Sequence, residues 1–338
     1  MRNTAERDNP GDAHPNRSLR LLAPAKINLH LRVGPRRSDG FHPLLTWMAT
    51  IGLFDSLSLT LDFTRNRSDG VVMSSDDPSL PCDHRNLVVK AANLFREERP
   101  SMPAVSIHLE KRVPAGGGLG GGSSDAASTL LGLNRLWVKT VGEAVASTRA
   151  AQRAVEGTEE LRGLCEMASR LGSDVPFFLY GPSSICKGRG EAVRPIGGPE
   201  RAKWVTLVLP PMAMPTADVY RKFDAMNLGR EQDIEREPGW DEWVKLGSRS
   251  LLAQLVNDLE PPAFALRPDL GELRTAIERS LDRPVRMSGS GSSLFTLFDE
   301  REEAHAAAEQ IAANHGVRAV AVELSVQRNP NDETRIPE

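Results

Sequence analysis

The chain has 338 residues, of which 40% are apolar and 26% charged, a composition typical of a globular protein with one elaborated domain or two ordinary ones. Its formal net charge of -3 provides no overall positive field, which argues against nucleic-acid binding and leaves local sites to identify a partner. Three widely spaced cysteines form no CxxC pair, which argues against a disulfide framework or a zinc knuckle and favours a reducing cytoplasm.

The two ends of the chain are polar. Residues 1–18 are charged and lack the apolar core of a secretory signal, so we expect a disordered arm there, and a flexible tail over residues 328–338. No stretch reaches the about 20 apolar residues that a membrane-spanning helix needs. We therefore expect no membrane association.

The first elements indicate a sheet. Apolar and polar residues alternate over residues 19–33, and Gly34-Pro35 ends the run, which predicts a strand. The apolar segment 44–61 predicts its hairpin partner. Residues 104–110 alternate again and predict a strand with one polar face.

A glycine-rich stretch, PAGGGLGGGSSDAA, follows this strand at residues 114–127. Ser123 or Ser124 is suitable as the N-cap of a following helix, and Asp125 suits the positive end of a helix dipole. Apolar residues then recur at helical spacing. The order is strand, glycine loop, helix.

Glycine runs are commonly flexible linkers, but this run stands between a strand and a helix rather than between domains. Glycines there allow successive backbone N–H groups to turn inward at a helix N-terminus, which favours an anion such as a polyphosphate. The lysine of a GxxxxGK[ST] phosphate loop is missing, a GxGxxG match within such a run is weak, and protein-kinase signatures are absent. The residues by themselves indicate a nucleotide or phosphate cradle.

The rest of the chain mixes helices and strands. Residues 138–172 have helical patterning, with a polar stretch at 147–160 that is either a surface helix or an insertion. The remaining pattern predicts an α+β second domain, with a strand at 204–209, helices near 251–255 and 301–314, and a long surface loop at 227–243.

At this point the sequence resembles a known group of enzymes. The glycine stretch resembles a motif of the galactokinase, homoserine kinase, mevalonate kinase and phosphomevalonate kinase (GHMP) superfamily. Its expanded GGGLGGGSS form is similar to that of the 4-diphosphocytidyl-2-C-methyl-D-erythritol kinase family. Further blocks resemble that family in the same order: APAKINLHL (23–31), RSDGFHPLLT (37–46), NLVVKAA (86–92), LGSDVPFFLYG (171–181), NDLEPPAF (257–264) and MSGSGSSLFTLF (287–298).

The resemblance implies a two-domain α+β fold. Residues 19–188 correspond to an N-terminal ATP-binding and catalytic domain, which is ribosomal-protein-S5-domain-2-like in this superfamily. Residues 189–327 correspond to a C-terminal GHMP kinase domain, which is ferredoxin-like.

The implied activity is ATP-dependent phosphorylation of the 2-hydroxyl of 4-diphosphocytidyl-2-C-methyl-D-erythritol, a step of the non-mevalonate isoprenoid pathway. Lys26 and Asp174 correspond to the catalytic pair. The residues implied to bind ATP are Asn86, Leu87, Lys111, Pro114, Ala115, Gly116, Gly117, Gly118, Leu119, Gly120, Gly121, Gly122, Ser123 and Ser124. Magnesium is implied with ATP; its ligands are not identified beyond a contribution from Ser123 or Ser124.

Asn28, Phe41 and His42 correspond to the family's substrate contacts, with an aromatic face and a hydrogen-bonding edge suited to cytosine. The family more often has tyrosine at position 41. Tyr220 either stacks on the cytosine or packs near Phe223 as a helix residue.

The segment 288–291 is either a hairpin turn or, as the resemblance implies, a loop that closes over the phosphate region. The alternatives to this enzyme are another kinase of the superfamily, a non-catalytic nucleotide sensor, or an RNA-binding module. The sensor would usually have lost Lys26 or Asp174, and the charge balance argues against RNA. A cytoplasmic monomer or homodimer is expected, acting on a small molecule.

Overall fold

The structure is a computed structural model that describes residues 17–146 and 158–326. Two sheets organise these residues. The first sheet, six-stranded within the described chain, has the order β3-β4-β2-β5-β6, and β1 pairs with β2 off this path. Its strands are β1 (Arg17–Val33), β2 (Leu44–Asp62), β3 (Val71–Ser75), β4 (Ala104–Glu110), β5 (Ser183–Gly188) and β6 (Ala192–Pro195).

Helices cover the first sheet. They are α1 (Leu87–Glu97), α2 (Gly121–Ala146), α3 (Thr158–Leu171) and the short α4 (Phe177–Tyr180), with a 3₁₀ turn at Arg67–Asp69. Helix α2 packs on β1 and β2, and the interior between them is apolar, including Met48, Leu57, Leu59, Ala127 and Leu130.

The second sheet has the order β10-β7-β9-β8 and is covered by the longer helices α10 and α11. Its strands are β7 (Trp204–Leu209), β8 (Arg286–Met287), β9 (Leu294–Phe298) and β10 (Arg318–Glu323). The helices of this part are α5 (Thr216–Ala225), α6 (Glu231–Glu235), α7 (Trp240–Trp243), α8 (Ser248–Gln254), α9 (Glu260–Leu266), α10 (Pro268–Leu281) and α11 (Arg301–His315).

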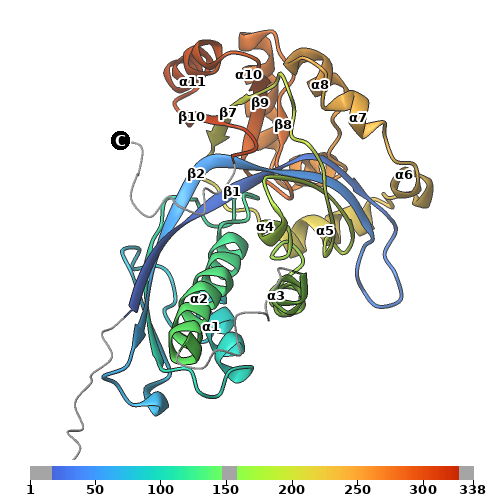
Figure 1. Ribbon diagram of the computed structural model, residues 1–338. Coiled ribbons are helices and arrows are strands. Elements are labelled where there is room, and N and C mark those ends of the chain that lie inside the picture. The colour runs from blue at the N-terminus through green and yellow to red at the C-terminus, as the bar shows by residue number, and fades with distance from the viewer. Residues whose placement is uncertain (1–16, 147–157, 327–338) are drawn as a thin grey trace, which may run out of the picture.

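Strands β1 and β2 cross the middle of the molecule, with α1, α2 and α3 on one side and the second sheet with α10 and α11 on the other (Figure 1). Ile27 and Leu29 of β1 therefore pack in one apolar cluster with Val205 and Phe295 of the second sheet. Because side chains alternate along a strand, the opposite face of β1 carries the polar residues between them. That polar face is also buried, so the alternation in the sequence marks a site rather than a solvent surface.

Most predicted elements are confirmed. The strands expected at 19–33, 44–61, 104–110 and 204–209 correspond to β1, β2, β4 and β7, and the helices near 251–255 and 301–314 correspond to α8 and α11. Strand β1 begins at Arg17, so the last two residues of the expected arm belong to the sheet. The rest of that arm, the tail at 328–338 and the stretch 147–157 lie outside the described residues.

Two local predictions are wrong. Helix α2 begins at Gly121, because the amide of Ser124 already donates the first helical hydrogen bond to the Gly120 carbonyl; neither Ser123 nor Ser124 is its N-cap. The expected surface loop at 227–243 contains α6 and α7.

Trp240 explains the second difference. Its side chain is buried in the apolar cluster between the two sheets, and its Nε1 donates to Glu237. The centre of its ring lies 5.8 Å from the ring centre of Trp47 and 5.8 Å from that of His30, both in edge-to-face arrangements. A large aromatic in a polar stretch thus anchors the segment to the core.

The domain limits remain a proposal. The limit expected between residues 188 and 189 falls within the hairpin of β5 and β6, since β6 pairs with β5 in the first sheet. We propose that the first domain extends through Pro195 and that the second begins before β7.

Two helical glycines test how tightly α2 packs. A Cβ on Gly132 would lie 2.3 Å from Leu59 Cδ1 and 2.4 Å from Leu21 Cδ1, whereas a Cβ on Gly163 in α3 meets no atom within 4 Å. We expect Gly132→Ala to lower the free energy of unfolding by about 1–3 kcal/mol through overpacking. Gly163→Ala, the matched control, should raise it by about 0.5–1 kcal/mol through helix propensity. Urea unfolding of both variants measures this, and equal effects at the two positions would contradict the packing described.

Candidate active site

A cavity of about 900 Å³ opens between the two parts of the molecule. It is lined by β1, the loop after β1, the glycine loop, the α3–α4 connection, α5 and the loop between β8 and β9. The predicted residues that line it are Lys26, Asn28, Phe41, His42, Asn86, Leu87, Lys111, Asp174, Tyr220 and every residue from Pro114 to Ser123. Ser124 does not line it and is fully buried, with its carbonyl accepting from Ser128 Oγ.

The glycine loop requires glycine at alternate positions. Gly116, Gly118 and Gly120 have φ values of +71°, +75° and +68°, the left-handed region that other residues rarely enter. Gly120 also lies against the Lys26 side chain, where a Cβ would be 3.0 Å from Lys26 Cε.

The carbonyls of this loop are anchored on the scaffold. The carbonyl of Leu119 accepts from the Lys26 amide at 2.9 Å, that of Gly118 from Ser288 Oγ at 3.0 Å, and that of Gly117 from the Ser293 amide at 3.2 Å. In a trans peptide the following N–H points the opposite way, so three successive amides are directed away from these anchors. Amides arranged in this way at the start of α2 form an anion site.

Lys26 and Asp174 come together from distant segments. Lys26 Nζ lies 3.4 Å from Asp174 Oδ2 and donates to Asn28 Oδ1 at 2.5 Å. The lysine is 3% exposed, while the Asp174 side chain is 36% exposed, which leaves the carboxylate accessible from the cavity. An ammonium and an accessible carboxylate at one point can orient a hydroxyl and accept its proton.

Asn28 is held on both sides of its amide. Its Oδ1 accepts from Lys26, and its Nδ2 donates to Thr46 Oγ1 at 2.9 Å, which in turn donates to the His30 carbonyl. This chain of bonds orients the amide and fixes the position of the lysine head group. Asn28 therefore positions Lys26, in addition to lining the cavity.

An aromatic group forms another end of the cavity. The His42 ring lies 5.0 Å from Tyr220 and 5.7 Å from Phe223, and His42 Nε2 is 2.7 Å from Asp224 Oδ1. Tyr220 is partly buried beside His42, and this burial, together with the nearby Asp174 charge, raises its pKa well above the usual value. Tyr220 packs against the core that contains Phe223 and also lines the cavity; its stacking on the cytosine stays a prediction.

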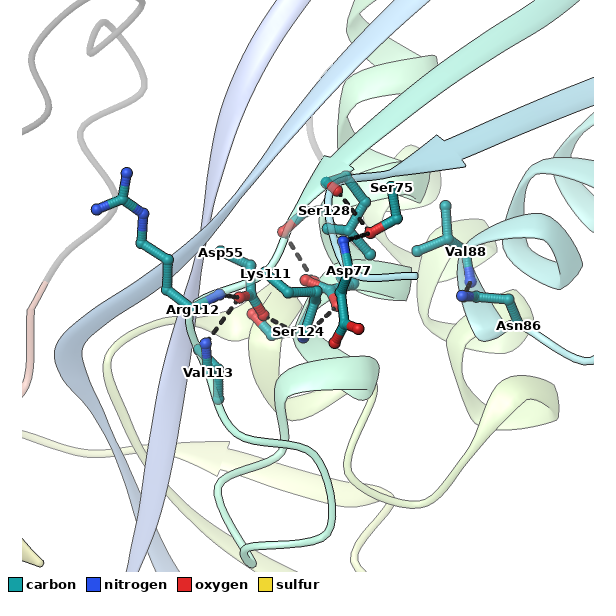
Figure 2. Close-up of polar contacts among 12 residues, drawn as sticks. Asp55, Ser75, Asp77, Asn86, Val88, Lys111, Arg112, Val113, Ser124 and Ser128 are labelled. Atoms are coloured by element: carbon teal, nitrogen blue, oxygen red, sulfur yellow. Dashed lines mark hydrogen bonds and ion pairs between the residues drawn. The ribbon is translucent and has the colours of Figure 1, made fainter. Parts of the chain in front are cut away.

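Asn86 and Lys111 are engaged with the protein itself. Asn86 caps α1, accepting from the Val88 amide at 2.9 Å (Figure 2). Its side-chain amide also donates to the Pro81 carbonyl at 2.8 Å. These bonds hold the wall of the cavity formed by Leu80 and Leu87.

Lys111 bridges two buried carboxylates. Its ammonium donates to Asp55 and, at 3.0 Å, to Asp125 Oδ2; Asp55 also accepts from the amides of Arg112 and Val113 (Figure 2). Burial alone would lower the Lys111 pKa, but the two carboxylates outweigh it and raise that pKa. Burial and the neighbouring Asp55 raise the pKa of Asp125 to about 7 against the opposing effect of Lys111.

Sequence reasoning missed several residues that line the cavity, among them Thr46, Ser173, Arg189 and Asp224. Thr46 and Ser173 lie within two of the blocks that resemble the family, whereas Arg189 and Asp224 lie outside all of them. The paired glycines around Arg189 indicate a tight turn, but only the fold shows that the turn reaches the cavity.

The described residues contain no group of three or more His, Cys, Asp or Glu side chains able to hold a metal ion. Ser123, at the start of α2, is the predicted magnesium contact that lines the cavity. Helices of the described chain also include none with the length and apolar character to cross a bilayer.

Asp125 makes stability depend on pH in a defined direction. Its pKa rises from 3.8 to about 7 on folding, so the folded state binds the proton more tightly. Protonation of Asp125 therefore adds to the free energy of unfolding at low pH. That contribution is lost as pH rises through this window. We expect the stability of Asp125→Asn, relative to the natural protein, to increase with pH between these values. Denaturant unfolding at a series of pH values measures the difference; a difference that does not change with pH contradicts the assignment.

Comparison with known proteins agrees with this geometry. The family description "GHMP kinases N terminal domain" matches residues 86–182, and "GHMP kinases C terminal" matches residues 241–317. At the level of fold, a crystal structure of mevalonate kinase aligns with a TM-score of 0.61 at 12% identity, covering 92% of this chain and 100% of that one.

More similar relatives carry one name. A 4-diphosphocytidyl-2-C-methyl-D-erythritol kinase of Bacillus cytotoxicus is 36% identical over 288 residues, 85% of this chain and 90% of that protein. Its namesake from Desulfotalea psychrophila is 34% identical over 312 residues, 90% and 95% of the two chains. A crystal structure of 4-(cytidine 5'-diphospho)-2C-methyl-D-erythritol kinase aligns with a TM-score of 0.66 at 34% identity, covering 91% of this chain and all of that one. The chain belongs to the 4-diphosphocytidyl-2-C-methyl-D-erythritol kinase family of the GHMP kinases.

Proposed function

We propose that the protein transfers the γ-phosphoryl group of ATP to the 2-hydroxyl of 4-diphosphocytidyl-2-C-methyl-D-erythritol. The observation that carries this proposal is that one cavity contains three adjoining features: an amide-lined anion loop, the Lys26–Asp174 pair and the Phe41–His42 aromatic end. They match the three parts of the reaction in order, namely a polyphosphate, a reacting alcohol and a pyrimidine. Family membership supports the same substrate.

In this proposal the glycine loop holds the β- and γ-phosphates. Its amides are fixed before ATP arrives, because the scaffold holds the loop carbonyls. Fixed dipoles stabilise charge without reorganising during the reaction, which is the main contribution a protein makes to phosphoryl transfer. The Gly120–Lys26 contact places the ammonium directly beside this loop.

Asp174 then orients the alcohol and accepts its proton as the oxygen forms a bond to the γ-phosphorus. The bond between that phosphorus and the bridging oxygen breaks, and ADP leaves. Lys26, which lies beside Asp174, stabilises the charge on the attacking oxygen and on the transferred group.

Magnesium fits this site only as part of the nucleotide. Residues 17–146 and 158–326 include no cluster of acidic, histidine or cysteine ligands for a metal ion, and magnesium is commonly held by substrate phosphates with few protein ligands. We propose that it enters with ATP, that it neutralises phosphate charge, and that the Ser123 hydroxyl is the side chain nearest to it.

The remaining polar residues suit recognition of the cytidine. Asp224 holds the His42 ring through Nε2, which leaves the rest of that ring edge for the base, and Phe41 is 50% exposed and free to offer an aromatic face. The lost phenol hydroxyl relative to the tyrosine common in the family removes one polar group but not the stacking surface. The free cysteines support the proposed cytoplasmic location.

Asp174→Asn tests the proposal. With ATP, magnesium and the diphosphocytidyl alcohol, we expect kcat to fall by roughly 10²–10⁴-fold, because the amide cannot accept the proton. KM for ATP should stay unchanged, since the phosphate loop is intact. The matched control is Asp241→Asn on α7, an exposed residue outside the cavity, which should retain full activity.

Two results would contradict the proposal. One is an Asp174→Asn enzyme with undiminished kcat, which would rule out Asp174 as the proton acceptor. The other is a natural protein that phosphorylates mevalonate or homoserine but not the diphosphocytidyl alcohol, which would favour another reaction of the superfamily.

A further inference from the structure

Arg189 occupies the tip of the tight hairpin between β5 and β6. The residues on either side, Gly188 and Gly190, have φ values of +71° and +119°, and the Gly190 amide donates to the Lys187 carbonyl at 3.0 Å. The Arg189 amide donates to a Glu191 carboxylate oxygen at 2.6 Å. The backbone at Arg189 is therefore held in one conformation.

The arginine side chain reaches into the mouth of the cavity. Its Cζ lies 4.8 Å from the centre of the Phe41 ring, a cation–π contact. The neighbouring Gly190 packs on the other side, where a Cβ would be 3.4 Å from the Ser173 carbonyl and 3.7 Å from Asp174 Oδ1. The hairpin tip thus lies between the aromatic end and the Lys26–Asp174 pair.

Arg189 differs from the other cations of this cavity. Lys26, Lys111, Arg36 and Arg221 each have a carboxylate within ion-pair distance. Across residues 17–146 and 158–326, no carboxylate lies within that distance of the Arg189 guanidinium. Among the described residues, Arg189 is therefore a cation at the cavity mouth with no carboxylate as its counter-ion.

The proposed substrate supplies one. Its diphosphate links the cytidine to the alcohol and carries a negative charge on each phosphoryl group. With the base at Phe41 and His42 and the alcohol at Asp174, this diphosphate must cross the space in front of the hairpin tip. A guanidinium is the side chain best suited to phosphate oxygens, since it donates two parallel hydrogen bonds.

We propose that Arg189 binds the diphosphate of the alcohol substrate and thereby selects nucleoside-diphosphate-linked alcohols over uncharged or monophosphate ones. This inference rests on the proposed function. It assigns Arg189 to substrate binding and not to the transferred phosphoryl group.

Arg189→Met tests the inference, because methionine keeps an apolar stem against Phe41 and removes the charge. We expect KM for the diphosphocytidyl alcohol to rise by at least about tenfold, the effect of losing a charge-assisted hydrogen bond, with kcat and KM for ATP unchanged. Arg189→Lys should restore part of the loss. The matched control is Arg194→Met on β6, an exposed residue outside the cavity whose guanidinium pairs with Glu237 at 2.8 Å.

A binding measurement separates this inference from the proposed function. By calorimetry the natural protein should bind CDP more tightly than cytidine, and Arg189→Met should lose most of that preference while its affinity for cytidine stays the same. These affinities need no turnover, so they can be read even if the alcohol is not phosphorylated.

Three results overturn the inference. The first is a natural protein that binds CDP no better than cytidine. The second is an Arg189→Met variant, folded by its thermal transition, with the same CDP preference and KM as the natural protein. The third is a fall in kcat with KM unchanged, which would place the guanidinium on the transferred phosphoryl group instead.

Discussion

The contact on which the site depends is a backbone-to-backbone one, between the glycine loop and the loop at 288–293. A Cβ on Gly118 would lie 2.2 Å from the Ser288 carbonyl oxygen, so any other residue would push the two loops apart. Ser288 Oγ and the Ser293 amide hold the loop carbonyls from the second sheet, while the Lys26 amide holds the next one from β1. The proposed phosphate site is thus assembled from both parts of the molecule, and its amides cannot be set without either.

Two buried lysines show how the surroundings divide structural from chemical roles. Lys111 lies between Asp55 and Asp125, both almost fully buried, and Asp55 is further tied to two backbone amides. Removing Lys111 would leave two buried carboxylates uncompensated, so this group fixes the join between β2, β4 and α2. Lys26 instead contacts an oriented asparagine and the partly exposed Asp174. Only this second pair keeps a carboxylate that an incoming hydroxyl can reach, and that difference in exposure is why we assign the chemistry to it.

Local patterns predicted the elements well where one periodicity dominated, as in β1, β4 and α11, and the glycine run correctly predicted a loop between a strand and a helix. The predicted start of α2 was wrong because the Gly120 carbonyl accepts the first helical hydrogen bond, so the helix begins before either serine. The prediction of a surface loop at 227–243 was wrong because burial of one aromatic side chain, Trp240, holds this otherwise polar segment against the core. The residues Lys26, Asp174 and Phe41 came from family resemblance, since an isolated lysine or aspartate has no distinguishing local pattern. Arg189 and Asp224 could not be assigned at all, because their relation to the cavity arises from strand pairing and helix packing over long sequence separations.

A structure with a non-hydrolysable ATP analogue and CDP bound together tests the central claim most directly. The account predicts that the triphosphate lies on the amides of Gly118, Leu119 and Gly120, with its terminal phosphoryl within hydrogen-bond reach of Lys26 Nζ and the CDP base at the Phe41 end. A triphosphate bound away from the glycine loop, or a terminal phosphoryl on the far side of the cavity from Lys26 and Asp174, would contradict it.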